Sequence, residues 1–198
     1  MVLIKLENLN YKLILRSIFI LGTSLLLFNC NNTSDLKQNL SCNEIYFNNL
    51  KEFSDAKNNF KISLPNNWKT STFTDNYQSS IYTADTTKQL TKSLLLDVNF
   101  INNSIQIDDI FKLKIEHENL TNKLIQKKQK EIIFLNRKSY YVISIGKKQK
   151  FKYKSLQVFV PLNKSSSLAI KAEIYGDSLV EKRICKALTL IGKIKIEQ

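Results

Sequence analysis

The chain has 198 residues and a formal net charge of +13, with 30 lysines and arginines against 17 acidic residues. Four glycines and two prolines exclude a collagen-like or low-complexity protein. The charge either predicts an anionic partner, such as lipid head groups, acidic glycans or nucleic acid, or reflects a composition rich in Lys, Asn and Ile throughout the chain, and both explanations stay open.

A signal peptide is predicted at the N-terminus. Lys5, Lys12 and Arg16 form a basic segment before an apolar run from Ser17 to Phe28, an order typical of exported precursors. The run has twelve residues, whereas a helix that crosses a bilayer needs about twenty. A permanent transmembrane anchor is therefore disfavoured.

The run ends in Leu27-Phe28-Asn29-Cys30, which resembles the lipobox of bacterial lipoproteins. Leu27 stands where the box has leucine, and Asn29 departs from the small residue usual before the cysteine; lipoproteins of the Bacteroidota are similar in tolerating looser boxes. The resemblance implies cleavage before Cys30, lipid (diacylglyceryl, palmitate-type) on its thiol, and anchoring to the cell envelope. An ordinary secreted protein and a single-span anchor are the alternatives.

These features predict three regions: a lipoprotein signal peptide over 1–29, a flexible tether over 30–41, and a single globular domain over 42–198. The polar stretch from Asn31 to Leu40 has no apolar period, as in a flexible linker. Asn31 is not the aspartate that retains some lipoproteins at the inner membrane, so we expect the outer membrane, facing the periplasm.

Strands dominate the pattern of the domain. Alternating apolar residues predict strands over Phe60–Leu64, Ser79–Ala84 and Leu94–Phe100, the first ending in a turn at Pro65–Trp68. A helical stripe predicts a helix over Ile107–Leu120. Four more strands are expected, with turns at 136–137, 146–148 and 163–165 and a bulge where the apolar phase slips between Tyr153 and Leu156: Glu131–Leu135, Ser139–Ile145, Phe151–Val160 and Leu168–Tyr175.

A closing helix is predicted to begin at a capping box of Ser178 and Glu181 and to end before Gly192. Its apolar stripe would lie on the sheet (Val180, Ile184, Ala187, Leu188 and Ile191). The order of elements predicts an α+β domain, with an antiparallel sheet flanked by helices.

The segment from Phe60 to Trp68 and the final helix from Ser178 resemble the PsbP-like α/β/α sandwich. That group includes an extrinsic photosystem II subunit, a Ran-binding nuclear transport factor and many bacterial lipoproteins. The resemblance spans about two thirds of the chain, from Phe60 to Ile191, and implies a noncatalytic binding or assembly module rather than an enzyme.

No catalytic constellation stands out from the residues either. The single histidine, His117, is expected on the exposed side of the middle helix, so a zinc site of the usual kind or a serine hydrolase triad lacks its residues. Asp108 and Asp109 fit the first turn of a helix rather than an acid pair. No glycine loop for phosphate is present, and no cofactor, metal or specific nucleic acid is expected.

Several packing alternatives stay open. Trp68 is expected to close an edge of the core. Tyr140, Tyr141, Tyr153 and Tyr175 would either form an outward binding surface or follow from strand propensity. The lysine runs at 127–130 and 147–150 are expected to be solvated faces or turns. Cys42 and Cys185 would either form a disulfide, as an exported pair suggests, or leave Cys185 free beside the core.

The predicted function is a membrane-anchored, noncatalytic binding or assembly module for an envelope component, with another envelope protein as the expected partner. Binding that is insensitive to salt and carried by an apolar patch would support it. The alternative is a polyanion-binding or surface-adhesive module that uses a basic face. A third candidate, a small apolar ligand between sheet and helix, requires a sizeable pocket.

Overall fold

The computed structural model describes residues 35–197, which belong to one of the two units into which the chain divides. Its helices are α2 (Asp35–Asn39), α3 (Asp109–Thr121) and α4 (Val180–Ile191), with a short 3-10 helix η2 (Leu90–Lys92). The strands are β1 (Leu50–Ser54), β2 (Phe60–Pro65), β3 (Lys69–Thr74), β4 (Gln78–Ala84), β5 (Leu95–Ile101), β6 (Leu124–Phe134), β7 (Arg137–Lys148), β8 (Phe151–Pro161), β9 (Ser167–Tyr175) and β10 (Lys195–Ile196).

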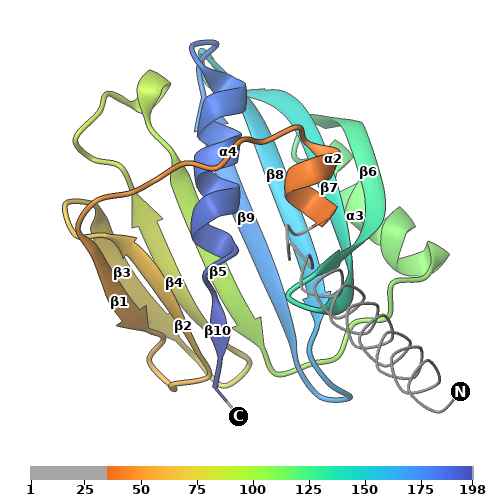
Figure 1. The fold of residues 1–198 in the computed structure, drawn as a ribbon. Coiled ribbons are helices and arrows are strands. Elements are labelled where there is room, and N and C mark those ends of the chain that lie inside the picture. Colours follow the sequence, from red (N-terminus) through yellow and green to blue (C-terminus); the bar gives the residue numbers. More distant parts are fainter. Residues whose placement is uncertain (1–34, 198) are drawn as a thin grey trace, which may run out of the picture. The chain divides into compact units, whose positions relative to one another are not determined.

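A large antiparallel sheet forms the centre of the domain, with strand order β3-β4-β5-β9-β8-β7-β6 (Figure 1). Strand β5 pairs with β9, about seventy residues later, from Leu95 opposite Glu173 to Ile101 opposite Ser167. A second, three-stranded sheet has the order β1-β2-β10. Strands β1 and β3 were not predicted, because neither has the alternating burial of a core strand.

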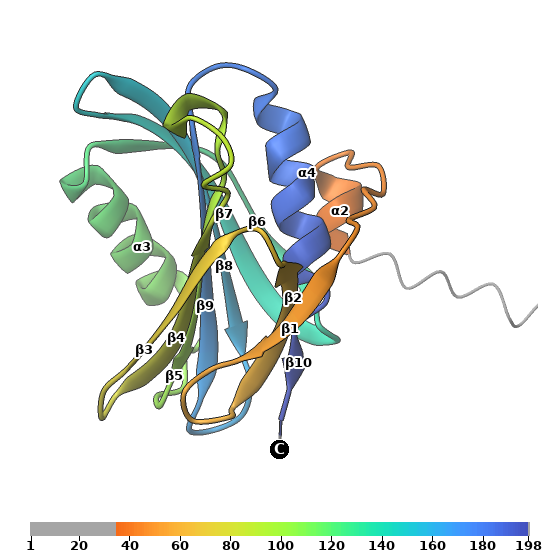
Figure 2. The same ribbon diagram turned by 90° about the vertical axis from the view of Figure 1, so that its left-hand side faces the viewer.

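Both faces of the large sheet carry helices. Figure 2 views the sheet from its edge, with α3 on one side and α4, α2 and the small sheet on the other. Helix α4 contacts β9 and β2, and α3 contacts β6. The prediction of an α+β domain with an antiparallel sheet flanked by helices is confirmed. Within residues 35–197, no helix has the length and apolar character needed to cross a membrane.

The main core lies between the large sheet and α4. Phe60, Ile62 and Leu64 of β2 are buried in it, as their alternation predicts. The predicted stripe of α4 also faces this core, where Ile184, Leu188 and Ile191 are fully buried. Trp68 contributes the edge of the core and packs edge-on against Phe47, with 6.5 Å between ring centroids.

The predicted flexible tether is wrong for its C-terminal part. Residues 35–39 form α2, and Leu36 on this helix is fully buried in the main core. Lys128 and Lys130 on β6 donate hydrogen bonds to Asn39. Leu36 and Leu40, the two leucines of this polar segment, anchor it to the core, and two apolar residues are too few to establish a period. The rest of the tether, the signal peptide and Cys30 lie outside the described residues.

The predicted bulge in β8 is wrong. The register between β7 and β8 is continuous from Tyr140 to Lys148, and the irregularity lies in β6, between Gln126 and Lys128. Tyr153 and Ser155 are buried on one face of β8, while Leu156 is buried on the other. The apolar phase slips because the two faces are covered by different helices.

Two local predictions also need correction. Residues 146–148 continue β7, and the turn follows at Gln149, which has a positive φ of 55°. The capping box does not form: α4 starts after Leu179, whose backbone is left-handed, without a side-chain cap. The carbonyl of Ser178 instead accepts a hydrogen bond from Arg183.

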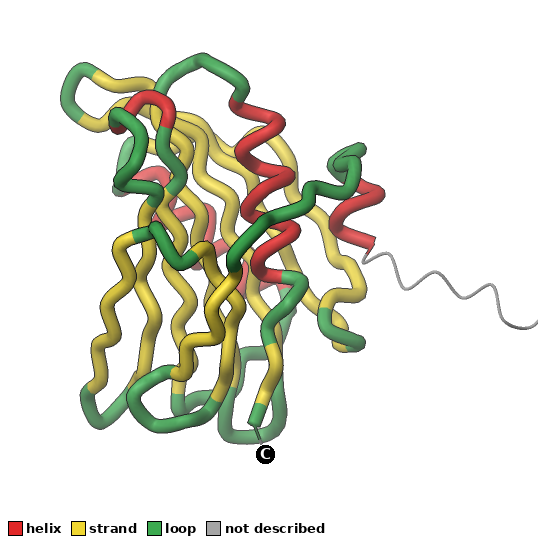
Figure 3. The backbone as a smooth tube through the Cα atoms, turned by 60° about the vertical axis from the view of Figure 1, so that its left-hand side comes forward, coloured by secondary structure: helices red, strands yellow, loops and turns green. Residues whose placement is uncertain are grey.

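A disulfide joins Cys42 and Cys185, with 5.2 Å between their Cα atoms. It ties the segment between α2 and β1 to the middle of α4. Figure 3 shows this segment as a loop that crosses α4. The bond closes a loop of 143 residues and clamps the N-terminal arm onto the closing helix.

Candidate functional site

A pocket of about 540 Å³ opens between the first turn of α4 and the ends of β6, β7, β8 and β9. Pockets of this volume are typical of small-molecule sites. Its lining combines three branched apolar side chains with four lysines (Lys123, Ile125, Ile145, Gly146, Lys147, Lys152, Tyr153, Lys154, Gly176, Asp177 and Val180).

Backbone geometry shapes the pocket at Gly146. A Cβ atom at this position would lie 2.8 Å from both Leu124 Cδ2 and the carbonyl oxygen of Lys123. Only glycine therefore lets β7 approach the start of β6 so closely. Lys123 has a positive φ of 58° and turns the chain directly from α3 into β6. The pocket is thus built where two strands meet at a helix end.

Apolar side chains form the floor. Ile125 and Ile145 are opposite each other on β6 and β7, and Val180 faces the pocket from α4. Ile125 is 57% exposed, which is unusual for an isoleucine between a sheet and a helix. The apolar surface is continuous and faces solvent, so an apolar ligand would gain free energy by covering it.

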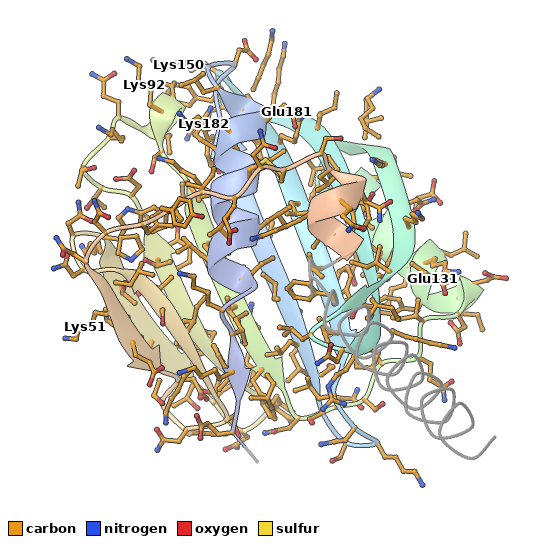
Figure 4. The ribbon with its side chains drawn as sticks, in the orientation of Figure 1. Lys51, Lys92, Glu131, Lys150, Glu181 and Lys182 are labelled. Carbon is orange, nitrogen blue, oxygen red and sulfur yellow. A yellow bond between two sulfur atoms is a disulfide. The ribbon has the colours of Figure 1, made fainter. Side chains whose placement is uncertain are left out.

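Lysines surround this floor. Lys152 pairs with Asp177 at 3.4 Å and Lys154 pairs with Glu181, whereas Lys123 and Lys147 have no ion-pair partner among the described residues. Figure 4 shows Lys150, Lys182 and Glu181 at this same end of the domain, while Lys51 lies far away on β1. Two lysines of the pocket, Lys123 and Lys147, therefore carry charge that no acidic group among the described residues compensates.

The four tyrosines do not form an outward binding surface. They are between 0% and 8% exposed (Tyr140, Tyr141, Tyr153 and Tyr175). Helix α3 covers the face that carries Tyr140, where Phe111 packs edge-on against Phe159 with 5.2 Å between centroids. Tyr141 is buried in the main core on the other face. Tyr153 stacks on Tyr175, also at 5.2 Å, and burial raises the pKa of both hydroxyls, which keeps them protonated.

Other predicted site residues are not brought together. His117 is exposed on α3, and Asp108 caps that helix by accepting a hydrogen bond from the Phe111 amide at 2.8 Å. Over residues 35–197, no cluster of three histidine, cysteine or acidic side chains could hold a metal ion. The residues found near the pocket were not predicted as a site, although Lys147 belongs to a lysine run that was noted.

An apolar stripe on the outer face of α3 is a second feature of the surface. Ile110, Leu113 and Leu120 are 79%, 63% and 59% exposed. Their spacing places them on one side of the helix, opposite Phe111 and Ile115, which face the sheet. Helix α3 is thus apolar on two sides and buries only one.

No protein-family model and no curated protein sequence matches the chain. Solved structures match its fold. Cyanobacterial PsbP from Synechocystis has a TM-score of 0.56 and 11% identity, over 79% of this chain and 97% of that protein. The Ran-binding protein Mog1p of Saccharomyces cerevisiae has a TM-score of 0.52 and 9% identity, over 75% and 95%. The chain shares the fold of these two proteins.

A structure from Bacteroides thetaiotaomicron has a TM-score of 0.47 and 11% identity, covering 76% of this chain. The chain spans 50% of that protein's length.

Proposed function

We propose that this protein is an exported lipoprotein, anchored through Cys30, whose domain binds an anionic amphiphile in the lysine-rimmed pocket without chemical turnover. The observation that carries the proposal is the apolar floor of Ile125, Ile145 and Val180, bordered by four lysines of which two have no ion-pair partner among the described residues. Mog1p is named as a Ran-binding protein, and a binding role on the same fold supports a noncatalytic module.

Two complementary interactions define the ligand class. An acyl chain would cover the isoleucines, and each buried methylene contributes about 0.8 kcal/mol. A carboxylate or phosphate at the end of the chain would meet Lys123 and Lys147, which have no acidic partner among residues 35–197. Neither a simple hydrocarbon nor a simple anion would use both parts of the site.

Calorimetric titration of the protein with sodium dodecanoate, below its micelle concentration, tests this proposal. We expect saturable binding at one site, and Ile125→Asp should weaken it at least about tenfold. The new carboxylate would lose its hydration beneath the acyl chain and would repel the anionic head group. Ile133→Asp is the matched control, since Ile133 is a half-exposed isoleucine on the same strand but outside the pocket. Equal binding by both variants would exclude the pocket as the site.

The head group can be tested separately. Dodecanol has the same chain without the charge and should bind more weakly than dodecanoate to the wild-type protein. The Lys123→Gln, Lys147→Gln double variant should lose this preference, and its affinity should depend less on salt. If the double variant still prefers dodecanoate, the lysines do not recognise the head group.

The anchor requires its own experiment. Cys30→Ser should abolish incorporation of radiolabelled palmitate in bacteria and release the protein from the membrane fraction, as expected when the acyl chains are lost. We propose the outer membrane, facing the periplasm, as its location. Wild-type protein that takes up no label would rule out lipidation, while leaving the pocket titration unaffected.

Docking to another envelope protein is the second candidate function, and the α3 stripe favours it. Leu113→Asp should then prevent recovery of a partner after cross-linking in intact cells, whereas the dodecanoate titration would be unchanged. The lysines around the pocket also fit the alternative of a polyanion partner. Binding to heparin that disappears in moderate salt and is unaffected by Ile125→Asp would favour that alternative.

A further inference from the structure

A second cleft, of about 260 Å³, lies on the other side of the sheet, beneath the C-terminal end of α3. Unlike the lysine-rimmed pocket, it is lined almost entirely by polar side chains (Glu118, Asn119, Asn122, Leu124, Lys147, Lys148, Tyr153, Gln157, Lys171 and Glu173). Helix α3 supplies one wall, and β8 and β9 supply the floor.

Two amide side chains in this lining each have one buried atom without a hydrogen-bond partner in the protein. Asn119 is 2% exposed, and its Nδ2 atom is unpaired. Gln157 on β8 has an unpaired Oε1 atom. A buried polar group without a partner costs about 1–3 kcal/mol, and such groups are normally satisfied by protein, water or a ligand.

A row of further unpaired groups lies on the same face of the sheet, next to the residues that line the cleft. Gln126 is opposite Ser144, Ser144 is opposite Ser155, and Ser155 is opposite Glu173, on four adjacent strands. The atoms Gln126 Nε2, Ser144 Oγ and Ser155 Oγ are buried and lack partners. Five unpaired polar atoms therefore gather in one layer between α3 and the sheet.

The other half of the same interface is apolar. Phe111 and Ile115 of α3 pack on Tyr140, Val142 and Phe159. One helical turn after Ile115, the inward position is taken by Asn119, and the facing strand positions become serine and glutamine. An amphipathic helix stabilises a fold by an apolar inner face, so packing alone does not account for this change.

The charged groups on the floor already satisfy one another. Lys171 contacts Glu173 at 2.6 Å, and the Tyr175 hydroxyl donates to Glu173 at 2.7 Å. Lys147 and Lys148 also line the cleft, but both are exposed to solvent. The buried groups left without partners are neutral amides and hydroxyls, which include both donors and acceptors. The ring of Tyr153 borders them and stacks on Tyr175.

We propose that this cleft binds a small neutral polyhydroxylated ligand, of the size of a pyranose monosaccharide. Each sugar hydroxyl is both donor and acceptor, so one ring can satisfy Asn119 and Gln157 together. Its carbon-bound hydrogens fit the face of an aromatic ring such as Tyr153. Lys147 and Tyr153 border both clefts, but Asn119 and Gln157 line only this one, and the ligand chemistry differs from that of the amphiphile site.

Titration with D-glucose, D-galactose and N-acetyl-D-glucosamine, followed by ¹H–¹⁵N NMR of the full-length protein, tests the proposal. At least one sugar should cause saturable shifts in the side-chain amide signals of Asn119 and Gln157. Asn119→Leu and Gln157→Leu should each weaken binding at least about tenfold. Gln106→Leu, an exposed amide in the loop before α3, is the matched control and should bind normally.

Thermal unfolding shows whether the leucine variants are folded, so that a loss of binding can be assigned to the cleft. The leucine variants should be at least as stable as the wild type, because they remove unpaired buried groups. Folded variants that bind sugar as well as the wild type would overturn the proposal. Absence of saturable shifts with all three sugars would also overturn it, and the cleft would then be filled by ordered water.

Discussion

Arg183 on α4 donates a hydrogen bond of 2.7 Å to the carbonyl of Ser93, although 90 residues separate the two in the chain. The same guanidinium donates to the carbonyls of Tyr175 and Ser178. Arg183 is 5% exposed, and burial lowers its pKa. It has no carboxylate partner within the described part of the chain. Carbonyl dipoles therefore hold this buried cation and join the loop before β5 to the start of α4.

Removal of this cation should be costly. Arg183→Met is expected to lower the free energy of unfolding by about 3 kcal/mol, because three buried carbonyls lose a charged donor. Urea unfolding monitored by circular dichroism measures the loss. Lys182→Met, at the exposed neighbouring position, should change stability by less than about 0.5 kcal/mol. Similar midpoints for the two variants would contradict a structural role for Arg183.

The Cys42–Cys185 disulfide should stabilise the domain through the unfolded state. A loop of 143 residues corresponds to an entropic limit of about 5 kcal/mol, and 2–4 kcal/mol is typical of measured disulfides. The Cys42→Ala, Cys185→Ala double variant should unfold at a correspondingly lower urea concentration. Reductant should lower the urea midpoint of the wild type and leave that of the variant unchanged. A wild-type midpoint that is the same with and without reductant would contradict the presence of the bond.

The burial of Asp97 should make the stability of the domain depend on pH. Burial raises the pKa of this carboxyl on β5, despite a hydrogen bond from Asn99 and the charge of Lys171. A carboxyl with a raised pKa favours the folded state while protonated, and this contribution is lost as pH rises through its folded pKa. Asp97→Asn should therefore stabilise the domain at neutral pH and lose this advantage in acid.

Urea midpoints of wild type and variant across the acidic range measure this effect. Asp75→Asn, in the exposed hairpin between β3 and β4, provides the comparison. A variant that is less stable than wild type at neutral pH would mean that attraction to Lys171 outweighs burial.

Gly146 should not tolerate a side chain. Gly146→Ala places a methyl group against Leu124 and the Lys123 carbonyl, and crowding of this kind costs about 1–3 kcal/mol. The variant should also bind dodecanoate more weakly, because Gly146 lines the pocket. Gly192→Ala is the comparison: its φ of −65° suits any residue, so a smaller loss is expected. Calorimetric titration of both variants measures the affinity for dodecanoate, and urea unfolding measures the loss of stability.

Local sequence was a good guide where one pattern decides one element. The alternation of Phe60, Ile62 and Leu64 predicted β2, and the stripe through Ile184 and Leu188 predicted α4. The order of helices and strands along the chain was sufficient to predict the α+β class and the likeness to the PsbP fold. These features depend on which residues share a face, and the periods of strands and helices determine that directly.

Patterns did not reveal what covers each face. Tyr140 and Tyr153 could have pointed to solvent, and only the packing of α3 and the closeness of Tyr175 bury them. The slip in β8 resembled a bulge because one strand presents different residues to two helices. Leu36 is one of only two leucines in a polar segment, and the contacts of its helix with β6 and α4 made it part of the core.

The sequence by itself predicted a leader that is cleaved before Cys30, and it indicated the nature and order of most elements of the domain, because these depend on neighbouring residues. Tertiary structure alone decided the pairing of Cys42 with Cys185, the apolar floor between Ile125 and Val180, and the unpaired amides of Asn119 and Gln157. Each of these joins residues that are far apart in the chain, and their meeting depends on how the sheet twists and which helix covers it.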